Sequence, residues 1–204
     1  MIKNIIFDFG DVIIKFNPKE IAKKYTNNPE ELDFIIKEVV NSEEWLGKGL
    51  IDLGEISLLE AASRINKRTN YIHEDLVNSY LRDLPNNFTY NGDILNLLNK
   101  LKNKGYKLYL LSNISSEDFI YYKADLEELF NGLVLSYELH EIKPNRPIYD
   151  YLLDTYNLNP EECLFIDDRL DNIKTANSLG IKGRQVNKDD YEDILNVLEE
   201  YDIL

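Results

Sequence analysis

The stretch IIFDFGDV, residues 5–12, places an aspartate directly after a short apolar run near the start of the chain. A short, uninterrupted apolar run predicts a strand that is buried on both faces, as in a parallel sheet. Open parallel α/β sheets bind ligands beyond the carboxyl ends of their strands, which is where Asp8 would lie. Asp8 is therefore the first candidate site residue, and a parallel sheet is the first candidate architecture.

The rest of the chain alternates short apolar runs with longer helical patterns. The candidate strands are Asn4–Phe7, Lys107–Leu111, Leu133–Ser136, Leu164–Ile166 and, more weakly, Gly183–Val186. Spacing of 3.6 residues predicts helices over Asp93–Lys104, Asp118–Leu126, Pro147–Tyr156 and Asp171–Leu179. This order predicts an α/β fold, a Rossmann-like three-layer core in which helices cover both faces of a parallel sheet.

Residues 15–87 interrupt this alternation, because they contain helical patterns and no convincing strand. Asn17-Pro18 and Asn28-Pro29 each predict a helix start, with asparagine as the N-cap and proline in the first helical position. Further helices are expected over Ser57–Lys67 and His73–Leu84. We therefore expect an inserted α-helical cap at 15–87 and a catalytic α/β core made of 1–14 and 88–204.

Composition and charge exclude several classes of partner. The chain has 204 residues, 44% hydrophobic and 29% charged, which is typical of a globular protein. Its net charge of −14 argues against nucleic acid and anionic membranes as partners, and no apolar stretch approaches a bilayer span. A small anionic substrate stays compatible, because a bound metal and local cations reverse the field within one pocket. Cys163 is the only cysteine and the N-terminus has no signal-peptide pattern, so we expect a cytoplasmic monomer or homodimer.

Polar residues also follow two later apolar runs, as Asp8 follows the first. Ser112 and Asn113 come after the run at 108–111, where a hydroxyl and an amide can bind phosphoryl oxygens near the start of the next helix. Asp167 and Asp168 follow the run at 163–166. Adjacent carboxylates repel each other, so this pair suggests a cation close by.

Lys143 completes the set, because it precedes a proline and a predicted helix, where a lysine can neutralise a phosphate as a point charge. Each motif alone has an ordinary structural alternative, such as a helix cap or a solvated surface group. Together, in this order, they predict a carboxylate nucleophile, a phosphate-binding site and an oxygen-ligand metal site.

These motifs resemble those of the haloacid dehalogenase-like hydrolase superfamily over nearly the whole chain. The matching segments are FDFGDV at 7–12, LSN at 111–113, KP at 143–144 with IY at 148–149, and FIDD at 165–168. The insertion resembles the small helical cap of that superfamily. Within it, GLI at 49–51 and GEIS at 54–57 are two candidate matches to the Gly-x-Ile-Ser segment common there.

The resemblance implies a Mg²⁺-dependent phosphatase that hydrolyses a small phosphorylated metabolite. Asp8 would attack phosphorus to form an aspartyl-phosphate, which water then cleaves, while the cap closes over the substrate. The implied Mg²⁺ ligands are the carboxylates of Asp8, Asp167 and Asp168 and the backbone carbonyl of Gly10. The implied phosphate-binding residues are Gly10, Ser112, Asn113 and Lys143, of which Ser112 and Lys143 act in catalysis with Asp8.

Gly10 departs from the family pattern. Most phosphatases of the superfamily carry a second aspartate two residues after the nucleophile, which protonates the leaving oxygen and contributes about 10²–10⁴-fold to the rate. Three hypotheses remain: Asp11 reaches back, the leaving group needs little protonation, or the site binds phosphate without turnover. We favour an anomeric sugar phosphate or an acyl phosphate as substrate, because a subgroup resembling sugar-1-phosphate phosphatases shares the Asp-x-Gly start.

Two other functions share parts of this pattern. A metal-independent dehalogenase uses the same nucleophile on carbon, but the acidic pair and the lack of a basic halide site near Asp8 speak against it. A catalytically poor phosphate-binding or regulatory protein would bind Mg²⁺ and phosphate analogues without releasing product. A phosphomutase is disfavoured, because that chemistry depends most on the missing second aspartate.

Overall fold

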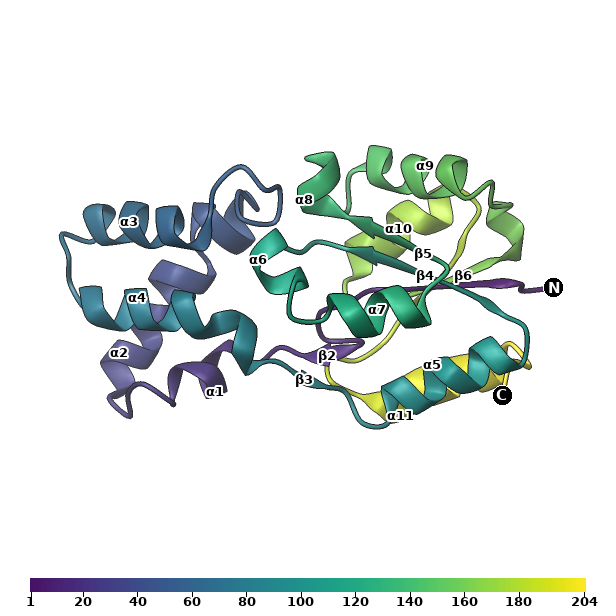
Figure 1. The fold of residues 1–204 in the computed structure, drawn as a ribbon, viewed down its shortest axis with the longest axis horizontal. Helices are drawn as coiled ribbons and strands as arrows, with labels where there is room; N and C mark the ends of the chain where they lie inside the picture. Colours follow the sequence, from purple (N-terminus) through teal and green to yellow (C-terminus); the bar gives the residue numbers. More distant parts are fainter.

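The computed structural model describes residues 1–204, and a five-stranded parallel sheet lies at its centre (Figure 1). The strands are β1 Asn4–Phe7, β4 Lys107–Ser112, β5 Gly132–Leu135, β6 Cys163–Asp167 and β7 Lys182–Gln185, in the spatial order β5-β4-β1-β6-β7. β1 lies in the middle, where Ile5 pairs with Leu108 of β4 on one side and Leu164 of β6 on the other. All carboxyl ends of the strands therefore meet at one edge of the sheet.

Helices cover both faces of this sheet. They are α5 Ile94–Asn103, α6 Ser116–Phe119, α7 Lys123–Leu129, α8 Ser136–Leu139, α9 Arg146–Thr155, α10 Leu170–Ser178 and α11 Tyr191–Glu200, with a short 3-10 helix, η4, at Pro160–Glu162. α5 and α11 lie on one face, and α9 and α10 lie on the other (Figure 1). None of the helices has the length and apolar character that crossing a bilayer requires.

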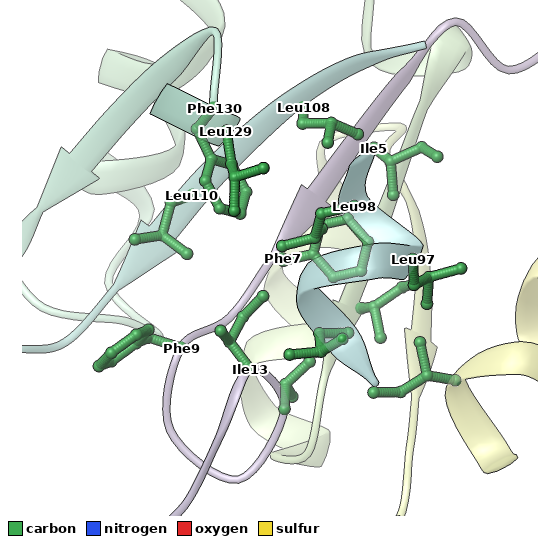
Figure 2. Packing of buried hydrophobic residues seen from close by; sticks show 14 of the residues in the cluster. Ile5, Phe7, Phe9, Ile13, Leu97, Leu98, Leu108, Leu110, Leu129 and Phe130 are labelled. Carbon is green, nitrogen blue, oxygen red and sulfur yellow. The ribbon is translucent and has the colours of Figure 1, made fainter. Parts of the chain in front are cut away.

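Successive side chains of a strand point to opposite faces of the sheet, so the strands contribute to two hydrophobic layers. Phe7 and Leu110 belong to a cluster of 27 buried residues that also includes the inner faces of α5 and α11 (Figure 2). The neighbouring Ile6 belongs to a cluster of 12 buried residues with Phe165 and the inner faces of α9 and α10. Continuous apolar runs are needed to fill both layers, which explains why the strands were readable from sequence.

The inserted segment forms a helical cap with a hydrophobic cluster of its own, of 17 buried residues. Its elements are α1 Pro18–Ala22, α2 Pro29–Phe34, the π-helices η1 Ile35–Val40 and η2 Glu43–Gly47, α3 Leu58–Arg68, α4 Glu74–Asp83 and the 3-10 helix η3 Leu84–Asn87. The side chain of Asn17 accepts a hydrogen bond from the Glu20 N–H and that of Asn28 from the Glu30 N–H, so both predicted N-caps are confirmed. Two short antiparallel strands, β2 Ile14–Lys15 and β3 Thr89–Tyr90, carry the chain into and out of the cap.

The predicted fold class, a Rossmann-like three-layer α/β core with an inserted helical cap, is confirmed. The assignment of 1–14 and 88–204 to the core and 15–87 to the cap stays a proposal, which the separate hydrophobic clusters support. The predicted helix over Asp118–Leu126 is wrong as a single element, because α6 ends at Phe119 and α7 begins at Lys123. Between them lies Tyr122, a buried side chain whose hydroxyl donates to the carbonyl oxygens of Pro85 and Phe88 at 3.2 Å each.

Candidate active site

A cavity of about 360 Å³ opens at the carboxyl edge of the sheet, and most of the predicted site residues line it. Asp8 follows β1, Asn113 follows β4 and Asp168 follows β6. Lys143 reaches the same cavity from the segment between α8 and α9. The motifs therefore meet in space because the parallel strands that carry them end at one edge.

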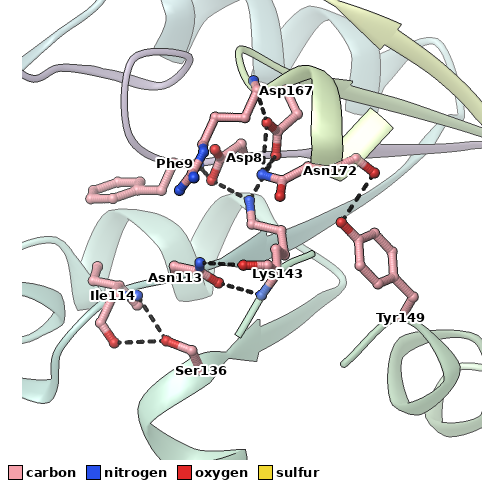
Figure 3. Close-up of polar contacts among 10 residues, drawn as sticks. Asp8, Phe9, Asn113, Ile114, Ser136, Lys143, Tyr149, Asp167 and Asn172 are labelled. Carbon is pink, nitrogen blue, oxygen red and sulfur yellow. Dashed lines mark hydrogen bonds and ion pairs between the residues drawn. The ribbon is translucent and has the colours of Figure 1, made fainter. Parts of the chain in front are cut away.

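Lys143 lies at the centre of this cluster (Figure 3). Its Nζ is 2.6 Å from Asp8 Oδ1 and 2.8 Å from Asp167 Oδ2, and its side chain is 1% exposed. Burial alone would lower the pKa of Lys143, but the charges of Asp167 and Asp8 outweigh burial and raise it. Lys143 is thus a fixed buried cation between two carboxylates.

Asn113 holds the backbone of this lysine. The Asn113 Oδ1 accepts from the Lys143 N–H at 2.8 Å, and its Nδ2 donates to the Lys143 carbonyl oxygen at 3.0 Å (Figure 3). These two bonds make Asn113 a positioning residue for Lys143. Its direct contact with a phosphoryl group stays a prediction.

The two adjacent aspartates have different surroundings. Asp167 is fully buried, and its oxygens accept from the Arg169 N–H at 2.7 Å and from Asn172 Nδ2 at 2.9 Å, besides the ion pair with Lys143. Asp168 lines the cavity, and its closest cation is the Lys188 ammonium at 3.4 Å. Asp168 therefore has more capacity left for a further ligand than Asp167.

The donor set fits a divalent metal ion. Asp8, Asp167 and Asp168 each offer a carboxylate oxygen, and these atoms all lie within 4.8 Å of one another. Together with Asp11, they put four carboxylates against the two ammonium groups of Lys143 and Lys188, which leaves two negative charges unbalanced. Oxygen-only ligands and this residual charge suit Mg²⁺.

Ser112 differs from the other predicted phosphate-binding residues. Its side chain is fully buried at the end of β4 and is not part of the cavity lining. Its Oγ has no hydrogen-bond partner, although a buried hydroxyl usually has one. A phosphoryl oxygen would satisfy it, so the phosphate contact of Ser112 stays a prediction with this orphaned hydroxyl in its favour.

The surroundings of Gly10 leave room for a side chain. A Cβ built on Gly10 would meet no atom within 4 Å, so the place of the missing acid is open space. The next carboxylate, Asp11, accepts from Lys188 Nζ at 2.7 Å and from the Phe16 N–H at 3.2 Å. Asp11 is therefore engaged in an ion pair, which disfavours the hypothesis that it donates a proton.

Four polar residues that line the cavity were not predicted as site residues from the sequence: Asp52, Asp118, Arg169 and Lys188. Asp118 begins a predicted helix, and in the structure its N–H donates to Ser115 Oγ, the N-cap of α6, while its Oδ2 accepts from the same hydroxyl at 2.7 Å. Asp52 and Lys188 lie in loops without a motif, and only the fold brings them to the cavity.

An apolar wall faces these polar groups. Phe16 and Trp45 line the cavity from the side of the cap, with ring centroids 5.5 Å apart. Phe88 continues this wall, with its ring centroid 5.6 Å from that of Phe16. One side of the cavity can therefore bind carbon surface while the other binds charged and hydroxyl groups.

Comparisons with known proteins agree with this geometry. A family model described as haloacid dehalogenase-like hydrolase matches residues 2–180. The D-ribitol-5-phosphate phosphatase of Bacteroides thetaiotaomicron is 27% identical over 196 residues, which cover 89% of this chain and 90% of that protein. The drimenol cyclase drtB of Aspergillus calidoustus is 27% identical over 93% of this chain, but the chain spans only 35% of that longer protein.

A solved structure shows the same architecture. The HAD family enzyme bt-2542 from Bacteroides thetaiotaomicron superimposes with a TM-score of 0.72 at 25% identity, covering 96% of this chain and 98% of that one. That enzyme has also been solved in complex with magnesium and inorganic phosphate.

Proposed function

Because the chain belongs to the haloacid dehalogenase-like hydrolase family, we propose that it is a Mg²⁺-dependent phosphatase acting through an aspartyl-phosphate on a small phosphorylated metabolite. The observation that carries the proposal is the buried contact between the Asp8 carboxylate and the Lys143 ammonium, with Asp168 beside them. This arrangement combines a nucleophile, a fixed cation for phosphoryl oxygens and an oxygen-ligand metal site.

Asp8 is oriented for nucleophilic attack. Its Oδ1 accepts from the Phe9 N–H at 2.6 Å and from the Lys143 ammonium, whereas its Oδ2 takes no hydrogen bond. Burial raises the pKa of the Asp8 carboxyl, and the Lys143 ammonium opposes that rise. A second cation at the site would favour the ionised nucleophile further.

Lys143 neutralises charge on the phosphoryl group as it is transferred. Asp167 holds the Lys143 ammonium in place. The Asp167 carboxylate is itself fixed by hydrogen bonds from the Arg169 N–H and from Asn172 Nδ2. Asp8, Asp168 and the Gly10 carbonyl are the residues that would hold Mg²⁺. When bound, Mg²⁺ supplies charge neutralisation and a fixed orientation for the phosphoryl oxygens.

The two-sided cavity favours a sugar or sugar-alcohol phosphate as substrate. Hydroxyl groups of such a ligand can donate to the Asp118 carboxylate, while its carbon surface lies against the aromatic wall. The relative named for D-ribitol-5-phosphate supports this substrate class. A cytoplasmic location and a monomeric or homodimeric state are parts of the same proposal.

The proposal is tested by measuring phosphate release from hexose-1-phosphates, hexose-6-phosphates, pentitol phosphates, an acyl phosphate and an aryl phosphate, with and without Mg²⁺. We expect Mg²⁺-dependent turnover that falls at least about 10³-fold in Asp8→Asn, because the nucleophile is removed. Asp171→Asn is the matched control, since Asp171 lies exposed on α10. Turnover that survives in Asp8→Asn, or that ignores Mg²⁺, would contradict the proposal.

A further inference from the structure

The proposed phosphatase reaction needs a proton that residue 10 cannot give. An alcohol leaves phosphorus most easily when its oxygen is protonated as the bond breaks, and Gly10 has no side chain to do this. The cavity carboxyls besides Asp8 are Asp11, Asp52, Asp118 and Asp168. Asp11 and Asp168 are both close to the Lys188 ammonium, and Asp168 belongs to the metal site, so Asp52 and Asp118 remain.

The loop that carries Asp52 is fixed against the core. It connects η2 and α3 in the cap, and the Asp52 carbonyl oxygen accepts from Ser136 Oγ at 2.5 Å at the start of α8. Ser136 Oγ in turn accepts from the Ile114 N–H at 2.9 Å, directly beside the site (Figure 3). Gly54 has a φ of +69° and packs so closely that an added Cβ would lie 2.9 Å from the Tyr137 carbonyl oxygen.

The Asp52 carboxyl itself is uncommitted. It lines the cavity and takes part in no hydrogen bond or ion pair, although its backbone is held. Asp118 lines the same cavity from α6 in the core, and its Oδ1 is buried without a partner. Two carboxyl groups from the cap and the core thus face one space without a cation bound to either.

The buried position of Asp52 favours its protonated form. Burial raises the pKa of Asp52 to about 7, and the like charge of Asp118 contributes to the rise, while Arg169 and Lys143 oppose it. Glu55 in the same loop is exposed, and the His140 ring contacts the loop with its Nδ1 2.8 Å from the Leu53 carbonyl oxygen. A carboxyl that is partly protonated near neutral pH suits proton transfer to a leaving oxygen.

We propose that Asp52 is the general acid of this site, supplied by the cap in place of a side chain at residue 10. As Asp8 Oδ2 bonds to phosphorus and the bond from phosphorus to the leaving oxygen breaks, that oxygen takes the proton of Asp52 and departs as the alcohol. A water molecule then attacks phosphorus, the bond to Asp8 breaks, both water protons leave on the released dihydrogen phosphate, and the Asp52 carboxylate takes up a proton from solvent. Asp8 is again a carboxylate, Asp52 is again protonated, and inorganic phosphate is released.

The decisive variant is Asp52→Asn, assayed on a sugar-alcohol phosphate and on p-nitrophenyl phosphate. We expect kcat to fall about 10²–10⁴-fold on the sugar-alcohol phosphate and less than about threefold on the aryl phosphate, whose leaving group needs no proton. Retained aryl turnover shows in the same sample that the variant is folded and loaded with Mg²⁺. Glu55→Gln is the matched control, because it removes a charge from the same loop at an exposed position.

Two further measurements separate proton donation from substrate recognition. The general acid must be protonated, so kcat/KM of the wild type on the sugar-alcohol phosphate should fall as pH rises through about 7. This basic limb of the pH profile should vanish in Asp52→Asn. Asp118→Asn removes a like charge and should move the limb to lower pH. Gly10→Asp added to Asp52→Asn should restore at least about tenfold of the lost rate, since the space at residue 10 is open.

Equal losses on both substrates, an unchanged pH limb, or a change in KM alone in Asp52→Asn would overturn the assignment of Asp52 while leaving the proposed phosphatase intact. A wild type that releases phosphate from no substrate would overturn both.

Discussion

Lys143 is the residue whose contacts most constrain the site, because one ammonium group balances two buried carboxylates. In Lys143→Met, Asp8 and Asp167 lose that charge although both carboxylates are buried. We expect the free energy of unfolding in urea to fall by roughly 3–5 kcal/mol, as for other broken buried ion pairs. Turnover should fall about 10²–10³-fold, because a fixed charge for the phosphoryl oxygens is lost.

Lys174→Met is the control for that experiment, since Lys174 is exposed and pairs only with Asp171. Exposed pairs contribute roughly 0–1 kcal/mol, so the control should unfold close to the wild type. Equal free energies of unfolding of the two lysine variants would contradict a stabilising role for the buried ion pairs of Lys143.

Cys163 should be chemically silent in the folded protein. Its thiol is fully buried at the start of β6, and burial raises its pKa to about 11. Because the thiolate is the reactive form, labelling by a thiol reagent at pH 8 should be negligible in buffer and complete in denaturing urea. Rapid labelling in buffer would contradict the burial of this strand.

Asp8 and Asp168 could be predicted from sequence because each follows an apolar run, and Lys143 because it precedes a proline and a helix. The structure brings these three side chains together. Asp52 and Lys188 have no such pattern, since their place at the cavity depends on how loops distant in sequence fold onto the sheet edge.

The loop between η2 and α3 depends on Gly54, and a pair of glycine variants tests this. Gly54 and Gly105 both have positive φ, of +69° and +94°, but only at Gly54 would a Cβ meet other atoms within 4 Å. Gly105→Ala should lower the free energy of unfolding by about 1–2 kcal/mol through backbone strain alone, with kcat unchanged. Gly54→Ala should lose more stability and should also lower kcat on sugar-alcohol phosphates, because the loop carrying Asp52 is displaced.

Unfolding in urea and the two-substrate assay measure both effects. A Gly54→Ala protein with wild-type kcat on sugar-alcohol phosphates would show that the docked loop is not needed for proton transfer.

At the level of elements, β1, β4, β5 and β6 were predictable because their apolar residues fill the hydrophobic layers on the two faces of the sheet. The break between α6 and α7 was not, because it depends on Tyr122 bonding to carbonyl groups near β3, far away in sequence. Periodicity describes one helix face and carries no information about such a contact.

The whole molecule carries a net charge of −14, and the carboxylates of Asp8, Asp167 and Asp168 gather at the site. We expect Mg²⁺ to raise the melting temperature more than NaCl of equal ionic strength, because salt only screens general repulsion whereas bound metal stabilises the folded state. At a Mg²⁺ concentration 100-fold above its Kd, the gain is about 2.7 kcal/mol.

Asp168→Asn should abolish the difference between the two salts, since it removes the least engaged carboxylate of the cluster. The same difference in Asp168→Asn as in the wild type would place the metal elsewhere.

The overall architecture followed from sequence because alternating strand and helix patterns leave few ways to bury both faces of a parallel sheet. The way the cap meets the core did not follow. The contact between cap and core depends on the close packing of Gly54 against Tyr137 and on the hydrogen bond from Ser136 Oγ to the cap loop. Neither segment has a sequence pattern that predicts these contacts.

The most direct test of an aspartyl-phosphate on Asp8 is to quench the reaction with acid during turnover and to identify the phosphorylated peptide by mass spectrometry. We predict a phosphoryl group on Asp8 that forms only with Mg²⁺ present and is absent in Asp8→Asn. Steady turnover with no phosphoryl group on Asp8, or with one on another residue, would contradict it.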